Sequence, residues 1–157
     1  MNNKIVTVFG GSGFIGRHLV QRLAAGGAIV RVAVRDPEDA RYLKLMGDVG
    51  AVVPVAADIT DVDTTRAAVA GADWVVNLVG RLAGNEATFQ KLHVGGAANL
   101  AKLASEAGVR NFAHISALGA DAASPSNYAR SKAEGEAAVL AAFPGAVILR
   151  PSAIIGP

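Results

Sequence analysis

The stretch VFGGSGFIGRHLV, residues Val8–Val20, decides the fold of this chain. Three of its glycines, Gly10, Gly13 and Gly16, stand three residues apart, with apolar residues on both sides. A β-branched run, a glycine ladder and an apolar helical run together are typical of a strand, a tight turn and a helix. Gly10 allows the turn, Gly13 lets backbone N–H groups approach a phosphate, and Gly16 lets the helix lie close to the sheet. Packing alone would require only the last glycine, so the stretch predicts a phosphate-binding turn.

The rest of the chain alternates short β-branched runs with longer runs rich in alanine and leucine. We expect strands at residues 4–9, 29–34, 52–56, 74–78, 111–115 and 146–149. We expect helices at residues 13–25, 36–46, 61–70, 86–107 and 128–142. This order predicts an α/β fold with one doubly wound parallel sheet, strand order 3-2-1-4-5-6, and helices on both faces. A ligand is then expected at the carboxyl ends of strands one and four, where the winding reverses.

Composition narrows the class of protein. The chain has 157 residues, enough for one domain with a core, and 52% of them are hydrophobic. No apolar run approaches the roughly 20 residues that span a bilayer, and no signal peptide is recognisable. The net charge is only +2 and the basic residues are scattered, which argues against a nucleic-acid partner. The chain has no cysteine, so disulfides and thiolate metal sites are excluded. We therefore expect a cytoplasmic or matrix-like protein without a metal centre.

The residues after the second strand bear on the identity of the nucleotide. Val34 ends the strand, and Arg35 and Asp36 follow it. In dinucleotide-binding folds an acidic residue at this place holds the ribose hydroxyls, whereas an arginine accommodates a 2′-phosphate. Because Arg35 comes first and Asp36 also serves as a helix N-cap, we expect NADP(H) to be favoured over NAD(H). A solvated surface arginine is the alternative interpretation.

The glycine spacing, a Tyr-x-x-x-Lys pair and the ending ILRPSAIIGP resemble the short-chain dehydrogenase/reductase superfamily in its extended and atypical branches. The resemblance covers the whole chain and implies a Rossmann fold that binds a dinucleotide. It implies a phosphate-binding loop made of Gly10, Gly11, Ser12, Gly13, Phe14, Ile15 and Gly16. It also implies cofactor contacts from Asp58 and Ile59 at the adenine, from Asn77, Val79 and Gly80 below the nicotinamide ribose, and from Pro151 at the carboxamide. Asp58 as a turn residue and Asn77 as a tie between strands are the alternative interpretations.

A second motif bears on chemistry. Tyr128 and Lys132 stand four residues apart, which puts both side chains on one face of a helix. In the family that the chain resembles, the tyrosine is the general acid/base, and the lysine lowers its pKa and binds the ribose hydroxyls. A free phenol, with a pKa near 10, needs such help at neutral pH. The resemblance assigns the polarising serine to Ser116, with Ser126 and Ser124 as alternatives.

Two features point away from turnover. His93 stands where the family often has an asparagine, and we expect it to be a structural histidine that faces the helix core. The chain stops at Pro157, where extended members begin their substrate lobe. We expect one Rossmann domain over residues 1–157, truncated before that C-terminal lobe and inactive by itself.

Across its motifs, the sequence is most similar to an atypical group of this superfamily that includes the NAD(P)H-binding accessory subunit of respiratory complex I. This resemblance implies a bound dinucleotide and a membrane-associated respiratory complex as partner. An NAD(P)-dependent oxidoreductase, or a nucleotide-sugar epimerase or dehydratase, that uses Tyr128, Lys132 and Ser116 is the alternative.

Overall fold

Six short strands form one sheet in the computed structural model, which describes residues 3–156. The strands are β1 (Ile5–Phe9), β2 (Ile29–Val34), β3 (Val52–Ala56), β4 (Trp74–Asn77), β5 (Asn111–Ile115) and β6 (Val147–Leu149). Their order is β3-β2-β1-β4-β5-β6, and every neighbouring pair is parallel. This confirms the predicted doubly wound sheet. Phe9 lies opposite Ala33 and Asn77, so the carboxyl ends of three strands meet where the winding reverses.

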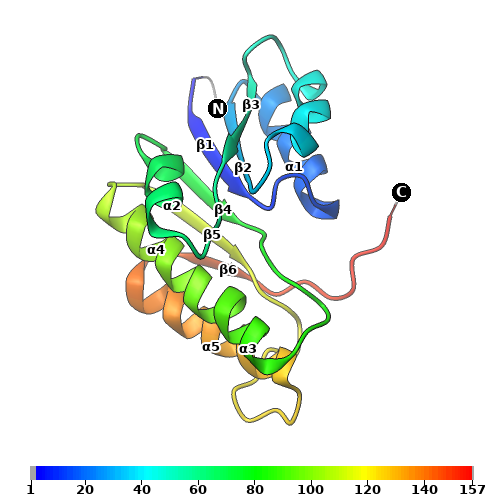
Figure 1. The fold of residues 1–157 in the computed structure, drawn as a ribbon, viewed down its shortest axis with the longest axis vertical. Helices are drawn as coiled ribbons and strands as arrows, with labels where there is room; N and C mark the ends of the chain where they lie inside the picture. Colours follow the sequence, from blue (N-terminus) through cyan, green and yellow to red (C-terminus); the bar gives the residue numbers. More distant parts are fainter. Residues whose placement is uncertain (1–2, 157) are drawn as a thin grey trace.

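Helices cover both faces of this sheet (Figure 1). Helix α1 (Phe14–Ala25) and the 3₁₀ helix η1 (Glu38–Met46) lie on one face, over a core cluster that contains Val8, Val32 and Leu43. The other face carries α2 (Val62–Val69), α4 (Ala97–Glu106) and α5 (Asn127–Ala142). Their core cluster contains Val75, Leu100 and Phe112. The valine-rich strands are buried on both sides because helices shield both faces, as a parallel sheet requires.

The predicted single helix over residues 86–107 is interrupted. It begins as α3 (Glu86–Phe89), continues as a π-helical segment η2 (Gln90–Gly96) and then becomes α4. The interruption lies where this helix crosses α5. A Cβ atom on Gly135 of α5 would lie 2.2 Å from the carbonyl oxygen of His93. The two helix backbones therefore touch at a position where only glycine fits. π-Helical turns are frequent at functional sites.

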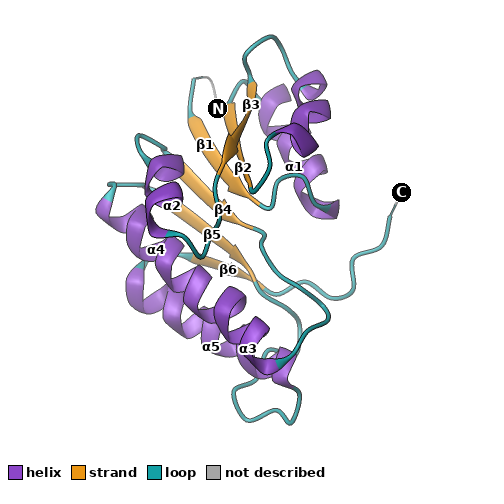
Figure 2. Cartoon of the chain, viewed as in Figure 1, coloured by secondary structure: helices purple, strands orange, loops and turns teal. Residues whose placement is uncertain are grey.

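The helices and strands lie close to the ranges expected from the sequence, and Figure 2 shows them coloured by type. Pro54 lies in β3, which is an edge strand, where a residue without a backbone N–H is tolerated. Asp61 caps α2 by accepting a hydrogen bond of 2.8 Å from Thr64 N. Helix α5 begins one residue before the predicted start, with Ser126 as its N-cap. Asp36 accepts from Glu38 N at 2.9 Å, but the segment that follows is a 3₁₀ helix.

Candidate functional site

The turn between β1 and α1 requires glycine at positions where a side chain would clash with the backbone. Gly10 has a positive φ of 78°, and a Cβ on it would lie 3.1 Å from the backbone of Leu78. A Cβ on Gly16 would lie 2.3 Å from the carbonyl oxygen of Gly10. The N-cap of α1 is Gly13, which has no side-chain cap, and the first turn contains no acidic residue. The N-terminus of α1 is therefore open to an anion, and its dipole favours one.

A pocket of about 920 Å³ lies in front of this turn, at the carboxyl edge of the sheet. This is the size range of a cofactor site. Of the predicted cofactor residues, it is lined by Gly10, Ser12, Gly13, Arg35, Asp58, Ile59, Val79 and Gly80. The predicted residues Gly11, Phe14, Ile15, Gly16, Asn77, Lys132 and Pro151 are outside its lining. Gly11 and Gly16 are buried behind the turn, where they let α1 pack closely.

One end of the pocket carries two cations and a carboxylate. Asp58 Oδ1 accepts hydrogen bonds of 2.8 Å from both Thr60 N and Thr60 Oγ1. These bonds, with the nearby charges of Lys91 and Arg35, hold the pKa of Asp58 below its usual value. Asp58 is thus an ionised acceptor that also closes the turn after β3. Arg35 is exposed, and it lines both this pocket and a smaller hollow beside it.

Sequence reasoning missed the wall of the pocket that follows β4. Thr88, Lys91 and Leu92 line it from α3 and η2. Lys91 and Leu92 stand three and four residues after Thr88, which puts all three on one helix face. This shared face is the sequence feature that could have predicted the wall. Arg81 also lines the pocket, directly after Gly80. The wall adds positive charge on the side that faces Asp58.

Asn77 connects two strands. Its Oδ1 accepts from Val79 N at 3.0 Å, which fixes the orientation of the amide. Its Nδ2 then donates to His114 Nδ1 of β5 at 3.1 Å. Asn77 and His114 are each 1% exposed, and His114 Nε2 is buried without a hydrogen-bond partner among the described residues. Asn77 therefore shapes the turn that carries Val79 and Gly80 from beneath.

Tyr128 and Lys132 lie on α5 beside this turn. Lys132 is 4% exposed, and its Nζ donates to the carbonyl oxygen of Ile115 at 2.8 Å. Burial lowers the pKa of Lys132 to about 8 and raises the pKa of the Tyr128 phenol. A Cβ on Gly80 would lie 3.9 Å from Lys132 Nζ, so the ammonium borders the pocket. The Ser116 hydroxyl is buried and has no hydrogen-bond partner among residues 3–156.

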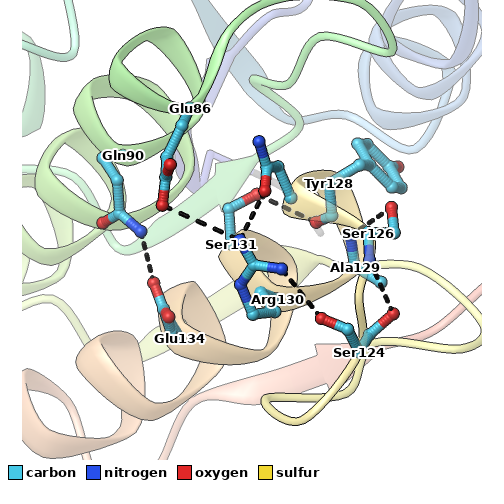
Figure 3. A network of polar contacts seen from close by, with 10 residues as sticks. Glu86, Gln90, Ser124, Ser126, Tyr128, Ala129, Arg130, Ser131 and Glu134 are labelled. Atoms are coloured by element: carbon cyan, nitrogen blue, oxygen red, sulfur yellow. Dashed lines mark hydrogen bonds and ion pairs between the residues drawn. The ribbon is translucent and has the colours of Figure 1, made fainter.

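A polar network holds the N-terminal end of α5, as Figure 3 shows. Arg130 donates to the carbonyl oxygen of Ser124 at 2.9 Å and lies 3.7 Å from the Glu86 carboxylate on α3. Gln90 donates to Glu134 at 2.5 Å. The two alternative serines serve this end of the helix. Ser126 Oγ accepts from Ala129 N at 3.4 Å, and Ser124 Oγ accepts from Ser126 N at 3.2 Å. The network orients the turn of α5 that carries Tyr128.

A doubly wound sheet, a glycine turn at its switch point and a large pocket in front of that turn define a dinucleotide-binding Rossmann domain. The chain belongs to the NAD(P)H-binding family, whose model matches residues 10–153.

Among curated proteins, the chain is 45% identical over 155 residues to a mitochondrial protein of Arabidopsis thaliana, subunit 9 of the NADH dehydrogenase (ubiquinone) 1 alpha subcomplex. That match covers 97% of this chain and 39% of the relative. The mitochondrial 40 kDa subunit of NADH-ubiquinone oxidoreductase from Neurospora crassa is 36% identical, with 96% and 40% covered. The ceramide reductase of Caulobacter vibrioides is 40% identical, with 98% and 47% covered. The chain thus spans less than half the length of these relatives.

Solved structures agree on the fold. A protein of Bacillus halodurans, described as an NAD-dependent epimerase/dehydratase, superposes with a TM-score of 0.83 at 23% identity. The superposition covers 96% of this chain and 71% of that one. A short-chain dehydrogenase/reductase superfamily protein of Agrobacterium tumefaciens with bound NAD gives 0.77 at 24% identity, with 93% and 48% covered. Within residues 3–156, no helix is both long and apolar enough to cross a membrane.

Proposed function

We propose that this domain holds NADP(H), in preference to NAD(H), as a tightly bound ligand. The pyrophosphate would lie at the N-terminus of α1, against the turn that contains Gly10 and Gly13. Arg35 would receive the 2′-phosphate, and Asp58 with Ile59 would contact the adenine. The observation that carries the proposal is the exposed guanidinium of Arg35 at the wall of a pocket that begins at the glycine turn.

The nicotinamide half would lie toward Gly80. Lys132 would bind the ribose hydroxyls, because its ammonium borders the Gly80 turn. Its bond to the Ile115 carbonyl uses one of three N–H donors and leaves two for a ligand. Pro151 would contact the carboxamide. Leu118 N donates to Pro151 O at 2.8 Å, which fixes that segment beside the end of β5.

Calorimetric titration tests the nucleotide preference. We expect NADPH to bind more tightly than NADH, and Arg35→Ala to reduce the NADPH affinity about tenfold or more while changing NADH binding little. Arg22→Ala, at an exposed position on α1 outside the pocket lining, is the matched control. Equal affinities of the unaltered protein for the two dinucleotides would refute the NADP(H) assignment.

We also propose that the protein is a subunit of a membrane-associated respiratory complex and not a free enzyme. Support comes from the plant relative, whose name places it in NADH dehydrogenase (ubiquinone), and from the fungal relative, whose name places it in NADH-ubiquinone oxidoreductase. Native fractionation of detergent-extracted membranes tests this: the protein should co-migrate with NADH:quinone oxidoreductase activity. Migration as a free species under conditions that keep the complex whole would contradict it.

A second candidate function, a dinucleotide-dependent reductase, is favoured by the Tyr128/Lys132 pair and by the similarity to the ceramide reductase. In this case Tyr128 would donate the proton, and Ser116 would polarise the substrate oxygen. The Ser116 hydroxyl is buried, which weighs against its polarising a substrate oxygen. Substrate-dependent oxidation of NADPH that disappears in Tyr128→Phe would establish this function in place of the subunit role.

A further inference from the structure

His93 lies at the centre of the contact between the pocket wall and α5. It belongs to the π-helical segment η2 and is 1% exposed. The Phe89 ring stacks on it at 5.2 Å, and the Tyr128 ring meets it edge-on at 5.7 Å. A side chain enclosed in this way has no freedom to change rotamer without moving two aromatic neighbours.

Both ring nitrogens of His93 are engaged. Arg81 N donates to Nε2 at 3.0 Å, so Nε2 carries no proton. Nδ1 therefore carries the proton of the neutral ring and donates it to Ser131 Oγ at 2.9 Å. Ser131 Oγ in turn donates to the carbonyl oxygen of Tyr128 at 2.9 Å. These bonds form one directed chain from the Arg81 amide to the backbone of Tyr128.

The two ends of this chain are parts of the candidate site. Gly80 and Arg81 line the pocket, and a Cβ on Gly80 would lie 3.7 Å from His93 Nε2. The same Cβ would lie 3.9 Å from Nζ of Lys132. Lys132 belongs to α5, the helix at which this series of hydrogen bonds ends. The turn after β4 is thus tied through one imidazole to the helix that carries Tyr128 and Lys132.

The surroundings keep this ring neutral. Burial, followed by the charge of Lys132, lowers the pKa of His93 to about 4. The other titratable groups that face it are Tyr128 of α5, at ring contact, and His114 of β5. A protonated ring would have two donors and no acceptor, and the bond from Arg81 N would be lost.

We propose that His93 is a positioning residue for the nicotinamide half of the ligand. Its Nδ1–H tautomer holds the Gly80–Arg81 turn at a fixed distance from α5, so that this turn and Lys132 together present one preformed surface to the nicotinamide ribose. The inference rests on the proposed dinucleotide binding. It adds that the two halves of the ligand depend on different parts of the chain, and that His93 serves only one of them.

Calorimetry with whole and half ligands tests the proposal. The whole ligand is NADPH, and the half ligand is 2′,5′-ADP, which contains the adenosine part alone. His93→Phe keeps the ring and its stacking but removes both hydrogen bonds. We expect it to weaken NADPH binding about tenfold and to change the 2′,5′-ADP affinity less than about twofold. His93→Gln supplies one acceptor and one donor again and should recover part of the loss.

Two further variants separate hydrogen bonding from packing. Ser131→Ala removes the acceptor of the Nδ1 proton with little change of volume and should lower NADPH binding selectively. It keeps the test valid if His93→Phe fails to fold. Phe89→Leu weakens the stack but keeps the hydrogen bonds, and it should affect stability more than the ratio of the two affinities. Nitrogen NMR of the imidazole should report a neutral ring protonated at Nδ1.

The outcomes are distinguishable. Equal weakening of both ligands, or no weakening of either, in His93→Phe and Ser131→Ala would overturn the positioning role and leave His93 as a packing residue. A ring protonated at Nε2 would overturn it as well. Failure of the unaltered protein to bind either ligand would instead refute the proposed function.

Discussion

The ammonium of Lys132 donates a hydrogen bond of 2.8 Å to the carbonyl oxygen of Ile115, the last residue of β5. The bond fixes the lysine beneath the pocket edge, where it is nearly excluded from water. It also directs the ammonium to the backbone. Burial is the one cause that shifts the pKa of the Tyr128 phenol, and it raises that pKa. Tyr128 and Lys132 have the spacing of an acid/base pair, but the raised pKa keeps the Tyr128 phenol protonated.

Tyr128 should therefore titrate above the ordinary tyrosine value of 10.0. The chain has two tyrosines, so a Tyr42→Phe background leaves Tyr128 as the one phenol, and ultraviolet difference absorbance reports its ionisation. Adding Lys132→Met should leave the midpoint raised, because burial is the cause. A midpoint below 10 that rises when Lys132 is removed would show that the lysine activates the phenol.

Lys132→Met should separate binding from stability. We expect NADPH affinity to fall about tenfold, because the ribose loses a donor, while the free energy of unfolding stays equal or rises by about 1 kcal/mol. The reason is that a buried ammonium is costly to desolvate, whereas methionine fills the same space. Urea unfolding monitored by the single tryptophan, Trp74, measures the second quantity. Lys102→Met, at an exposed position on α4, should change neither.

Two glycines of the turn should respond differently to alanine. A Cβ on Gly13 meets one atom, the Gly10 carbonyl oxygen at 3.2 Å, and its methyl would stand where a phosphate approaches. We expect Gly13→Ala to fold within about 1 kcal/mol of the parent and to lose at least tenfold in NADPH affinity.

Gly16→Ala places a Cβ 2.3 Å from that same oxygen, so the helix must move. We expect a loss of about 3 kcal/mol in unfolding free energy, seen as a lower urea midpoint. If the two variants lost affinity and stability in the same proportion, the distinction between a phosphate-facing and a packing glycine would be wrong.

Acid should destabilise the fold through two imidazoles. Burial and then the charge of Lys132 lower the pKa of both His93 and His114 from 6.5 to about 4. Between pH 6.5 and 4 these two imidazoles bind protons in the unfolded chain but stay neutral in the folded chain. The stability contribution is therefore full above pH 6.5 and falls as the pH drops toward 4. The loss is on the order of 3 kcal/mol for each imidazole.

Denaturant unfolding at a series of pH values measures this loss. His18→Gln, at an exposed position on α1, should leave the profile unchanged. Lys132→Met should make the fall smaller and end it at a higher pH, because loss of the Lys132 charge raises the pKa of both imidazoles in the folded chain while the unfolded chain still sets the onset near pH 6.5. The Asp73 carboxylate, with a pKa of about 2, contributes only at lower pH. A flat profile between pH 7 and 5 would exclude buried neutral histidines.

The sheet was predictable because its signals are local. β-Branched runs mark the strands, and glycines end helices where φ turns positive, as at Gly27 and Gly108. The glycine turn and the switch point of the sheet placed the pocket correctly for the same reason. Strand alternation was a signal left unused: Phe112, His114 and Ser116 share one buried side, which turns the Ser116 hydroxyl into the interior.

The π-helical segment was not predictable from periodicity. The segment packs against Gly135, which lies 42 residues after His93, and no local pattern in residues 86–107 records that contact. The bond between Asn77 and His114 likewise depends on strand register, which sets these two residues side by side. Contacts of this kind arise only when elements far apart in the sequence meet.

The crossing at Gly135 has a practical consequence for redesign. The wall that carries Lys91 and the helix that carries Tyr128 are separated by backbone atoms alone at that point. Because a Cβ on residue 135 would overlap the His93 carbonyl oxygen, Gly135→Ala should cost stability on the same scale as Gly16→Ala, and redesign of the site must keep glycine here.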